Sequence, residues 1–140
     1  MTGLEQLRWV MEHEGDDVPS IRRLLGIRVT EVEHGRVAMT VTTQPDFANP
    51  QGTVHGGVTA TLLDSVMGCA VHSTLPADTS YTTLELKVNY VRGVALDGRQ
   101  LTGEGHTVHV GRRTAVAEGR VLDEHGKLVG HATTTCLILA

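Results

Sequence analysis

Residues 58–75 read VTATLLDSVMGCAVHSTL, a stretch of 18 residues that contains one acid, Asp64, and no proline. The stretch is too long for an ordinary strand, and its length and composition are typical of a buried helix. A helix that is apolar nearly all round has to be covered by a sheet or by a partner chain. We therefore expect the rest of the fold to be built around this helix.

Alternating runs of apolar and polar residues, typical of strands, lie on both sides of the helix. They occupy 27–32, 37–41, 81–90, 99–110, 113–122 and 127–139, and turn-forming residues separate most neighbouring runs. In the third run, the period of two places on one face Leu84, Leu86, Val88 and Tyr90. Strands joined by tight turns pair antiparallel, so these runs predict an antiparallel sheet.

Two short helices are predicted before the first strand. Leu4, Leu7 and Met11 recur at mixed helical spacing, and a second stretch starts at residues 17–20 and continues to Leu25. The 140 residues fit a single domain. The predicted class is therefore α+β, one domain over 1–140, with 1–25 as a helical N-terminal extension and 26–140 as the core.

The charges are spread along the chain. The formal net charge is −4 and acids alternate with bases, so we expect no clustered basic surface for nucleic acid or anionic lipid. The start, MTGLEQLRWVMEHEGDD, has acids where a secretory leader needs a basic stretch, and no window reaches the ~18 apolar residues of a membrane span. Cys69 and Cys136 lie in apolar runs, as buried free thiols in a reducing compartment do. We expect a cytoplasmic protein with no membrane or nucleic-acid partner.

Asp64 is the unusual residue of the helix. Its neighbours at helical spacing include Ala60, Thr61 and Gly68, so the carboxylate lies on a stripe with small side chains. A buried carboxylate costs several kcal/mol unless it is paired or hydrogen-bonded. One explanation is structural, with a basic residue or a backbone donor across the fold. The other is that Asp64 carries chemistry.

The turn before the helix favours the second explanation. The segment DFANPQGTVHGG at 46–57 gathers Asn49, His55, Gly56 and Gly57 where a helix starts. The first amides of a helix are unpaired and carry positive partial charge, so a developing oxyanion is stabilised there. Each residue also has a plain role: His55 as a capping or surface residue, Asn49 as a turn former, and the glycines as a tight entry into the helix.

One helix cannot bring both halves of such a site together. Nine residues at a rise of ~1.5 Å place Asp64 roughly 13 Å along the axis from His55, which an aspartate side chain cannot bridge. If both groups act on one substrate, they come from two antiparallel copies of the helix, as in a twofold dimer. We therefore predict a composite site at a dimer interface.

Several segments carry a resemblance to a known family. They are NPQGTVHGG at 49–57, LLD at 62–64, Gly68, TLELKVNY at 83–90 and GRRT at 111–114. Together they resemble the hot-dog thioesterases of the phenylacetate-degradation and 4-hydroxybenzoyl-CoA type, over roughly residues 25–139. The resemblance implies a long central helix wrapped by a six-stranded antiparallel sheet. It also implies protomers that join their sheets into dimers, and dimers that commonly pair into tetramers.

The resemblance also implies roles for individual residues. Asp64 would be the catalytic carboxylate, as general base on water or as nucleophile. The Gly56 amide and the Asn49 side chain of the other protomer would polarise the thioester carbonyl, and His55 would assist the leaving thiolate. Thr83 would help to hold the water or the acid, where relatives often carry serine; its plain role is that of a β-former. Thioesters suit such a site because the thiolate leaves readily.

The resemblance further suggests that the segment Gly111, Arg112, Arg113 and Thr114, at a strand junction, contacts the phosphates of coenzyme A through a guanidinium fork. Surface arginines are common, so a role in solvation alone stays open. The expected substrate is an acyl-CoA, with no cofactor beyond the CoA portion of the substrate. A thioester carried by an acyl carrier protein is an alternative substrate, and the sequence does not indicate which acyl group is bound.

Other chemistries fit less well. No HExxH motif occurs, and His106 and His109, three apart on a strand, are expected on opposite faces, so we predict no metal site. No GxSxG motif occurs, and Ser65 projects about 100 degrees away from Asp64, which disfavours a serine hydrolase. A non-catalytic acyl-CoA-binding module and a hot-dog dehydratase acting on hydroxyacyl thioesters remain as alternatives.

Overall fold

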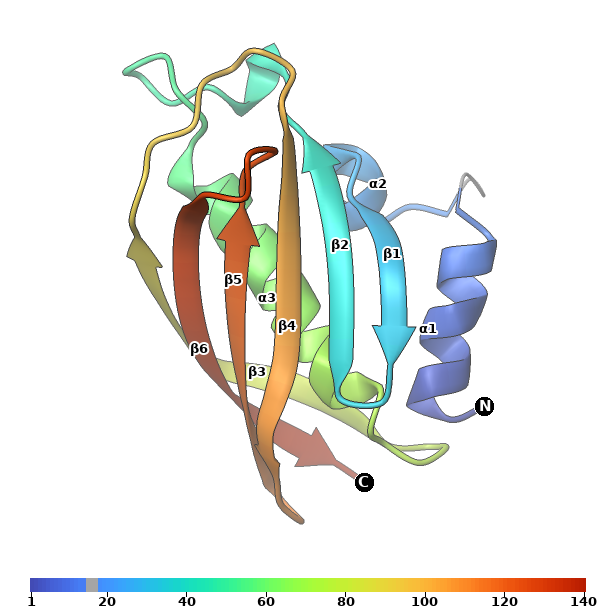
Figure 1. The fold of residues 1–140 in the computed structure, drawn as a ribbon. Coiled ribbons are helices and arrows are strands. Elements are labelled where there is room, and N and C mark those ends of the chain that lie inside the picture. The colour runs from blue at the N-terminus through green and yellow to red at the C-terminus, as the bar shows by residue number, and fades with distance from the viewer. Residues whose placement is uncertain (15–17) are drawn as a thin grey trace.

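In the computed structural model, which describes residues 1–14 and 18–140, one antiparallel sheet bends around a long helix, α3 (Gly56–His72) (Figure 1). The strands are β1 (Arg28–Glu33), β2 (Arg36–Thr42), β3 (Ser80–Tyr90), β4 (Gln100–Val110), β5 (Thr114–Leu122) and β6 (Leu128–Leu139). Their order in the six-stranded sheet is β1-β2-β4-β5-β6-β3. The α+β class and the helix wrapped by antiparallel strands are confirmed.

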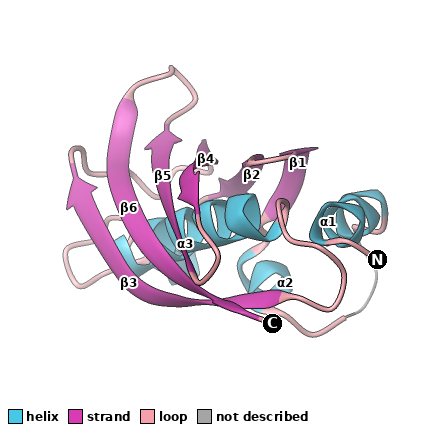
Figure 2. Ribbon diagram, turned by 90° about the horizontal axis from the view of Figure 1, so that it is seen from below, coloured by secondary structure: helices cyan, strands magenta, loops and turns pink. Residues whose placement is uncertain are grey.

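The sheet and α3 meet through large aliphatic side chains. Leu62, Leu63, Val66 and Met67 of the helix are fully buried. Glycines in β4 and β5 let the helix come close: a Cβ added at Gly105 would lie 2.4 Å from the Val66 carbonyl oxygen. The helix is therefore held on the concave side of the sheet (Figure 2) by packing that excludes a methyl group at that position.

The two short helices expected at the N-terminus are present. In α1 (Gly3–Glu12), a capping box joins Thr2 and Glu5, and α2 (Ile21–Leu25) starts at a Ser20 cap. The helix α1 lies against β1 and the end of α3, where the Gly3 N–H donates to the Leu75 carbonyl at 3.0 Å. Of the expected start of the second helix, Asp17 lies outside the described residues.

Strand β3 lies at one edge of the sheet and contains a β-bulge. Its pairing with β6 shifts register between Thr83 and Glu85, so Leu84 has no partner residue. The expectation that Leu84 shares a face with Leu86 and Val88 is wrong, since Leu84 is 58% exposed whereas Leu86 and Val88 pack against the core. The extra residue reverses the alternation at that point of the strand.

A second bulge changes the reading of the histidines on β4. The register shifts between Thr107 and His109, so His106 pairs with Glu118 and His109 with Val116. Because Glu118 and Val116 are two apart on β5, both histidines share one face; placing them on opposite faces was wrong. Within the described residues, no three His, Cys, Asp or Glu side chains are grouped so as to hold a metal ion.

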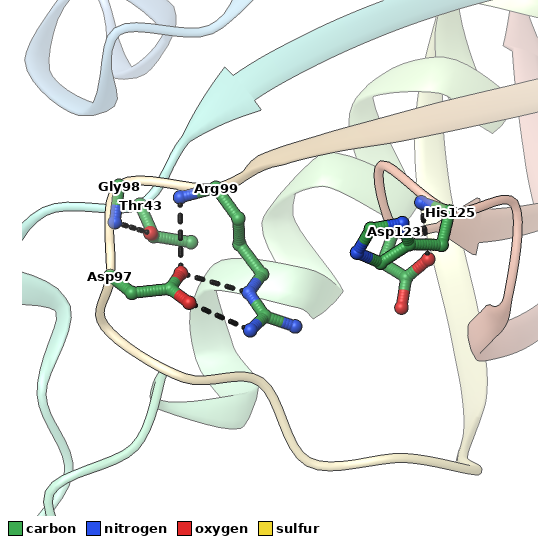
Figure 3. Close-up of polar contacts among 6 residues, drawn as sticks. All are labelled: Thr43, Asp97, Gly98, Arg99, Asp123 and His125. Carbon is green, nitrogen blue, oxygen red and sulfur yellow. Dashed lines mark hydrogen bonds and ion pairs between the residues drawn. The ribbon is translucent and has the colours of Figure 1, made fainter.

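The loops at one end of the sheet are fixed by polar contacts (Figure 3). In the connection from β3 to β4, the Arg99 guanidinium donates to Asp97 at 2.8 and 2.7 Å, and the Gly98 N–H donates to the buried Thr43 hydroxyl. The hydrogen bonds from Arg99 lower the pKa of Asp97 to about 2. In the β5–β6 turn, Asp123 accepts the His125 N–H at 2.9 Å. None of the helices described over 1–14 and 18–140 is long and apolar enough to cross a membrane.

Candidate active site

In the part of the chain that the structure describes, one side-chain hydrogen bond holds Asp64. The Thr83 hydroxyl on β3 donates to Asp64 Oδ1 at 2.9 Å. No ion pair to Asp64 is present among the described residues, so the structural explanation through a basic partner finds no support. Asp64 is only partly buried, although the sequence suggested a carboxylate on a fully buried face. The reason is that the sheet covers just one side of α3.

The uncovered side of α3 is lined by small residues. Its partly or fully exposed positions include Gly57, Ala60, Thr61, Asp64 and Ser65, whereas the sheet side holds the buried aliphatic residues. Small side chains allow another backbone or a substrate to come close to the helix. Asp64 therefore lies on the partly exposed side of the helix, among small side chains.

Two groups next to Asp64 are kept in their neutral forms. Burial, and then the negative charge of Asp64, raise the pKa of the Cys69 thiol to about 12. Burial also raises the pKa of Tyr81, whose hydroxyl lies across Gly68, 2.6 Å from where a Cβ would stand. The Cys69 thiol beside Asp64 is thus not a nucleophile near neutral pH.

Asn49 shapes the loop before α3. Its side-chain oxygen accepts the N–H groups of Gln51 at 3.1 Å and Thr53 at 3.0 Å, and its nitrogen donates to the Thr53 hydroxyl at 2.9 Å. The plain role of Asn49 as a turn former is therefore correct within the protomer. An amide nitrogen has two N–H donors, and one of them is still available to a substrate oxygen.

His55 caps α3, as its plain role proposed. Its Nδ1 accepts the Gly57 N–H at 2.8 Å. Among the described residues, the Gly56 N–H makes no hydrogen bond, so the first amide of the helix is open to an acceptor. Tyr90 on β3 donates its hydroxyl to the Gly56 carbonyl at 2.8 Å. Sequence reasoning missed this contact, because Tyr90 follows the apolar period of the strand.

The candidate residues thus form two groups in the protomer. Asp64 and Thr83 lie together, and Asn49, His55 and Gly56 lie together at the start of the helix. Asp64 lies eight helical rises after Gly56, ~12 Å along the axis, so one chain does not join the two groups.

The segment Gly111–Thr114 lies in the turn between β4 and β5, where the Gly111 N–H donates to the Thr114 carbonyl at 2.8 Å. Arg112, Arg113 and Thr114 are exposed. Across the sheet, Thr114 pairs with Leu137 and Leu137 with Thr82, so this turn lies near the start of β3.

Two cavities flank the start of α3. One, of about 290 Å³, is lined by residues that include Asn49, Gly56, Tyr90 and Arg92. The other, of about 330 Å³, is lined by residues that include Ile21, Phe47, His55 and Thr61. Clefts of roughly 300 Å³ with few polar groups are typical of small-molecule sites. The first helical turn is therefore reachable from both sides.

Two proteins with similar sequences indicate what this chain is related to. A Halobacterium salinarum protein, whose name places it among the esterases without a substrate, is 33% identical over 99 residues, which are 67% of this chain and 64% of that protein. The 1,4-dihydroxy-2-naphthoyl-CoA hydrolase of Listeria monocytogenes is 24% identical over 109 residues, 78% of this chain and 87% of that protein. This chain thus spans slightly under two thirds of the first relative.

Solved structures share the fold. The E. coli PaaI protein, from the phenylacetic acid degradation operon, superposes with a TM-score of 0.84 at 20% identity and covers 98% of this chain and 96% of its own. A hypothetical thioesterase of Streptococcus pneumoniae, solved with coenzyme A, gives a TM-score of 0.75 at 29% identity, with coverage of 81% and 86%. The family model of the Thioesterase superfamily matches residues 51–130, which contain all the residues of the two groups except Asn49. This chain, with its hot-dog fold, belongs to the Thioesterase superfamily.

Proposed function

We propose that this chain is a cytoplasmic acyl-CoA thioesterase that splits its substrate into a free acid and CoA. The observation that carries the proposal is the state of Asp64: an acid without a basic partner among the described residues, oriented by the Thr83 hydroxyl on the open side of α3. A carboxylate that is oriented but not neutralised is suited to accept a proton from water or to attack a carbonyl. The free thiols of Cys69, which is partly buried, and Cys136, which is buried, suit a reducing compartment.

The second half of the site would come from a partner copy. Hydrogen bonds tie Asp64 to Thr83 and Gly56 to Tyr90, so β3 and α3 run side by side in opposite directions. In a dimer, a twofold axis that passes near Ala60, midway between Gly56 and Asp64, would pair the start of one helix with the middle of the other. It would place the open Gly56 amide of one protomer beside the carboxylate of the other.

The same dimer would cover two surfaces that are exposed in the single chain. Strand β3 is an edge strand, and an unpaired edge is a template for another strand. The small residues Gly57, Ala60 and Ser65 on the uncovered side of α3 would let two helices approach closely. These features support a homodimer with two sites at its interface, and we extend the proposal to a dimer of dimers from the resemblance.

Each group has a step in the reaction. With Asp64 as base, a water molecule gives its proton to the carboxylate while its oxygen bonds to the thioester carbonyl carbon. The Gly56 N–H and the free Asn49 N–H would bind the carbonyl oxygen as it becomes negative. The intermediate then breaks the C–S bond, and His55 would assist the thiolate as it leaves. With Asp64 as nucleophile, the carboxylate adds instead, and water opens the resulting anhydride.

Coenzyme A as the leaving group is supported by two observations. The Streptococcus pneumoniae relative was solved with coenzyme A, and the Listeria monocytogenes relative is named for a CoA thioester. In this chain, Arg112 and Arg113 are exposed in the β4–β5 turn, near the start of β3. In the proposed dimer, these arginines would lie on the Asp64 side of the site and bind CoA phosphates.

The test is thiol release from a panel of aliphatic and aromatic acyl-CoAs. Asp64→Asn and Asp64→Ala should stay folded and lose at least ~100-fold in rate, as for removal of a general base. Glu124→Gln, which neutralises an exposed acid in the β5–β6 turn, serves as the control and should keep its rate. Folded Asp64→Ala protein with near wild-type turnover would refute the assignment. Release of an enoyl thioester instead of thiol would identify a dehydratase, and binding without turnover would identify a sensor.

The shared site has its own test. Asp64→Ala and Asn49→Ala chains are each inactive in the proposal, but a mixed dimer would contain one intact site. Mixing them should therefore restore part of the activity. Absence of recovery, with subunit exchange verified by mass spectrometry of tagged chains, would count against a composite site.

A further inference from the structure

Tyr90 makes a contact that neither the core nor the sheet requires. The residue is 55% exposed, and its main chain already pairs with Gly130 of β6. Its hydroxyl nevertheless donates to the Gly56 carbonyl at 2.8 Å, across 34 positions of sequence. Its ring lies close to Gly56, where an added Cβ would be 3.0 Å from the nearest ring carbon. Tyr90 therefore contacts the helix at the residue whose amide is open.

The peptide unit that Tyr90 contacts is held at its other end as well. The Gly56 carbonyl and the Gly57 N–H belong to one planar peptide. Tyr90 donates to its oxygen, and its N–H donates to His55 Nδ1 at 2.8 Å. With both ends bonded in addition to the hydrogen bonds of the helix, the plane has little freedom to rotate about the glycine backbone on either side. The direction of the preceding Gly56 N–H is restricted as a result.

The same peptide also sets the state of His55. A nitrogen that accepts an N–H bond has no proton of its own, so in the neutral ring the proton is on Nε2. Nε2–H is then the donor that His55 can offer to a substrate. A peptide that turned away would release Nδ1 and allow the other tautomer.

We propose that Tyr90 is a positioning residue of the active site: by clamping the Gly56–Gly57 peptide, its hydroxyl orients the Gly56 N–H and holds His55 as an Nε2–H donor. The inference rests on the proposed thioesterase function for its effect on rate. Its structural part, the tautomer of His55, stands independently of any activity. Tyr90 acts through the peptide and does not touch the reacting atoms.

The experiment compares Tyr90→Phe with Tyr81→Phe, the same chemical change on the same strand. The Tyr81 hydroxyl lies over Gly68 and reaches no peptide of the first helical turn. In Tyr90→Phe we expect kcat to fall about tenfold, less than the ~100-fold or greater loss on removal of an oxyanion donor, with KM within about twofold. Because Tyr81 lies next to Asp64, Tyr81→Phe is the reference for loss of a tyrosine hydroxyl in the measurement of the His55 tautomer, and Glu124→Gln is the reference for the rate.

The second readout is the ¹⁵N NMR spectrum of the histidine rings, with His55 assigned by the signals lost in His55→Gln. Wild type and Tyr81→Phe should show the neutral Nε2–H form, and Tyr90→Phe should show a mixture of tautomers. The Nδ1–H form in wild type, or a tautomer unchanged in Tyr90→Phe, would overturn the proposal, even if the rate fell. Absence of thioesterase activity in wild type would refute the proposed function, while the NMR comparison would still decide the role of Tyr90.

Discussion

Thr83 and Leu86 face the same side of β3, towards α3, although three positions separate them. In a regular strand, residues three apart point to opposite faces. The bulge at Leu84 removes this conflict by adding one residue to the strand. The Thr83 hydroxyl can therefore reach Asp64 while Leu86 remains packed against the core. The bulge is thus a part of the candidate site.

The Thr83 hydroxyl should matter more than the shape of its side chain. Thr83→Val keeps the shape but removes the donor to Asp64, so we expect a loss of about tenfold in kcat, less than the ~100-fold or greater loss on removal of the group that accepts the proton. Thr83→Ser keeps the hydroxyl and should retain most of the rate. Thiol-release kinetics of the two variants measure the difference. Equal rates for Val and Ser would show that the hydrogen bond has no part in catalysis.

Arg112 and Arg113 should affect binding of the CoA portion rather than the chemical step. Arg112→Gln and Arg113→Gln each remove one cation, so KM for acyl-CoA should rise by about fivefold to tenfold, as for loss of a charge-assisted hydrogen bond. The same acyl group on N-acetylcysteamine has no phosphates, so its kcat/KM should not change. Arg8→Gln on α1 is the control for charge alone. An equal loss with both substrates would exclude phosphate binding.

Gly105 should not tolerate a methyl group. A Cβ there would lie 2.4 Å from the Val66 carbonyl oxygen, so Gly105→Ala must push α3 away from the sheet, at a cost of about 2–3 kcal/mol of unfolding free energy. Gly93→Ala is the matched control, since no atom lies within 4 Å of its Cβ. It should be neutral or stabilise by up to about 1 kcal/mol. Urea unfolding measures both, and similar values would contradict the close packing.

Stability should fall in alkaline solution through Cys69. Its pKa is raised from 9.0 to about 12, chiefly by burial, so in that window the unfolded chain has lost a proton that the folded chain keeps. Fewer bound protons in the unfolded state make the unfolding free energy decrease as pH rises, and below pH 9 the effect is absent. Urea midpoints at several alkaline pH values should show this slope, and Cys69→Ala should reduce it. If the pH dependence is the same in Cys69→Ala as in wild type, another group causes the alkaline loss of stability.

Much of the fold could be predicted because it follows from periodicity. The 18-residue apolar run gave the helix, and the alternating runs with turns between them gave the six strands in the correct order along the chain. Asp64 was identified as an acid that the helix itself does not need. The N-cap role of His55 and the turn role of Asn49 were also among the sequence alternatives, because capping and turn residues act within a few positions.

The features that sequence could not give are those that depend on distant partners. Neither bulge, at Leu84 or next to His109, has a local signature, since each is defined by register against another strand. The alternation in the sequence therefore placed Leu84 and His109 on the wrong faces. The Tyr90 hydrogen bond was equally hidden, because its acceptor is a main-chain carbonyl that any residue would offer.

The open edge of β3 has a further consequence for the working concentration of the protein. A chain on its own keeps a row of main-chain donors and acceptors facing water, next to the exposed side chains of Leu84 and Val91. If the chain forms the proposed dimer, assembly follows mass action, so dilution should leave a growing share of single chains, in which the proposed composite site is incomplete. Turnover per chain would then decline in dilute solution. The open edge of β3 would also be the part of the single chain most prone to aggregate with other polypeptides.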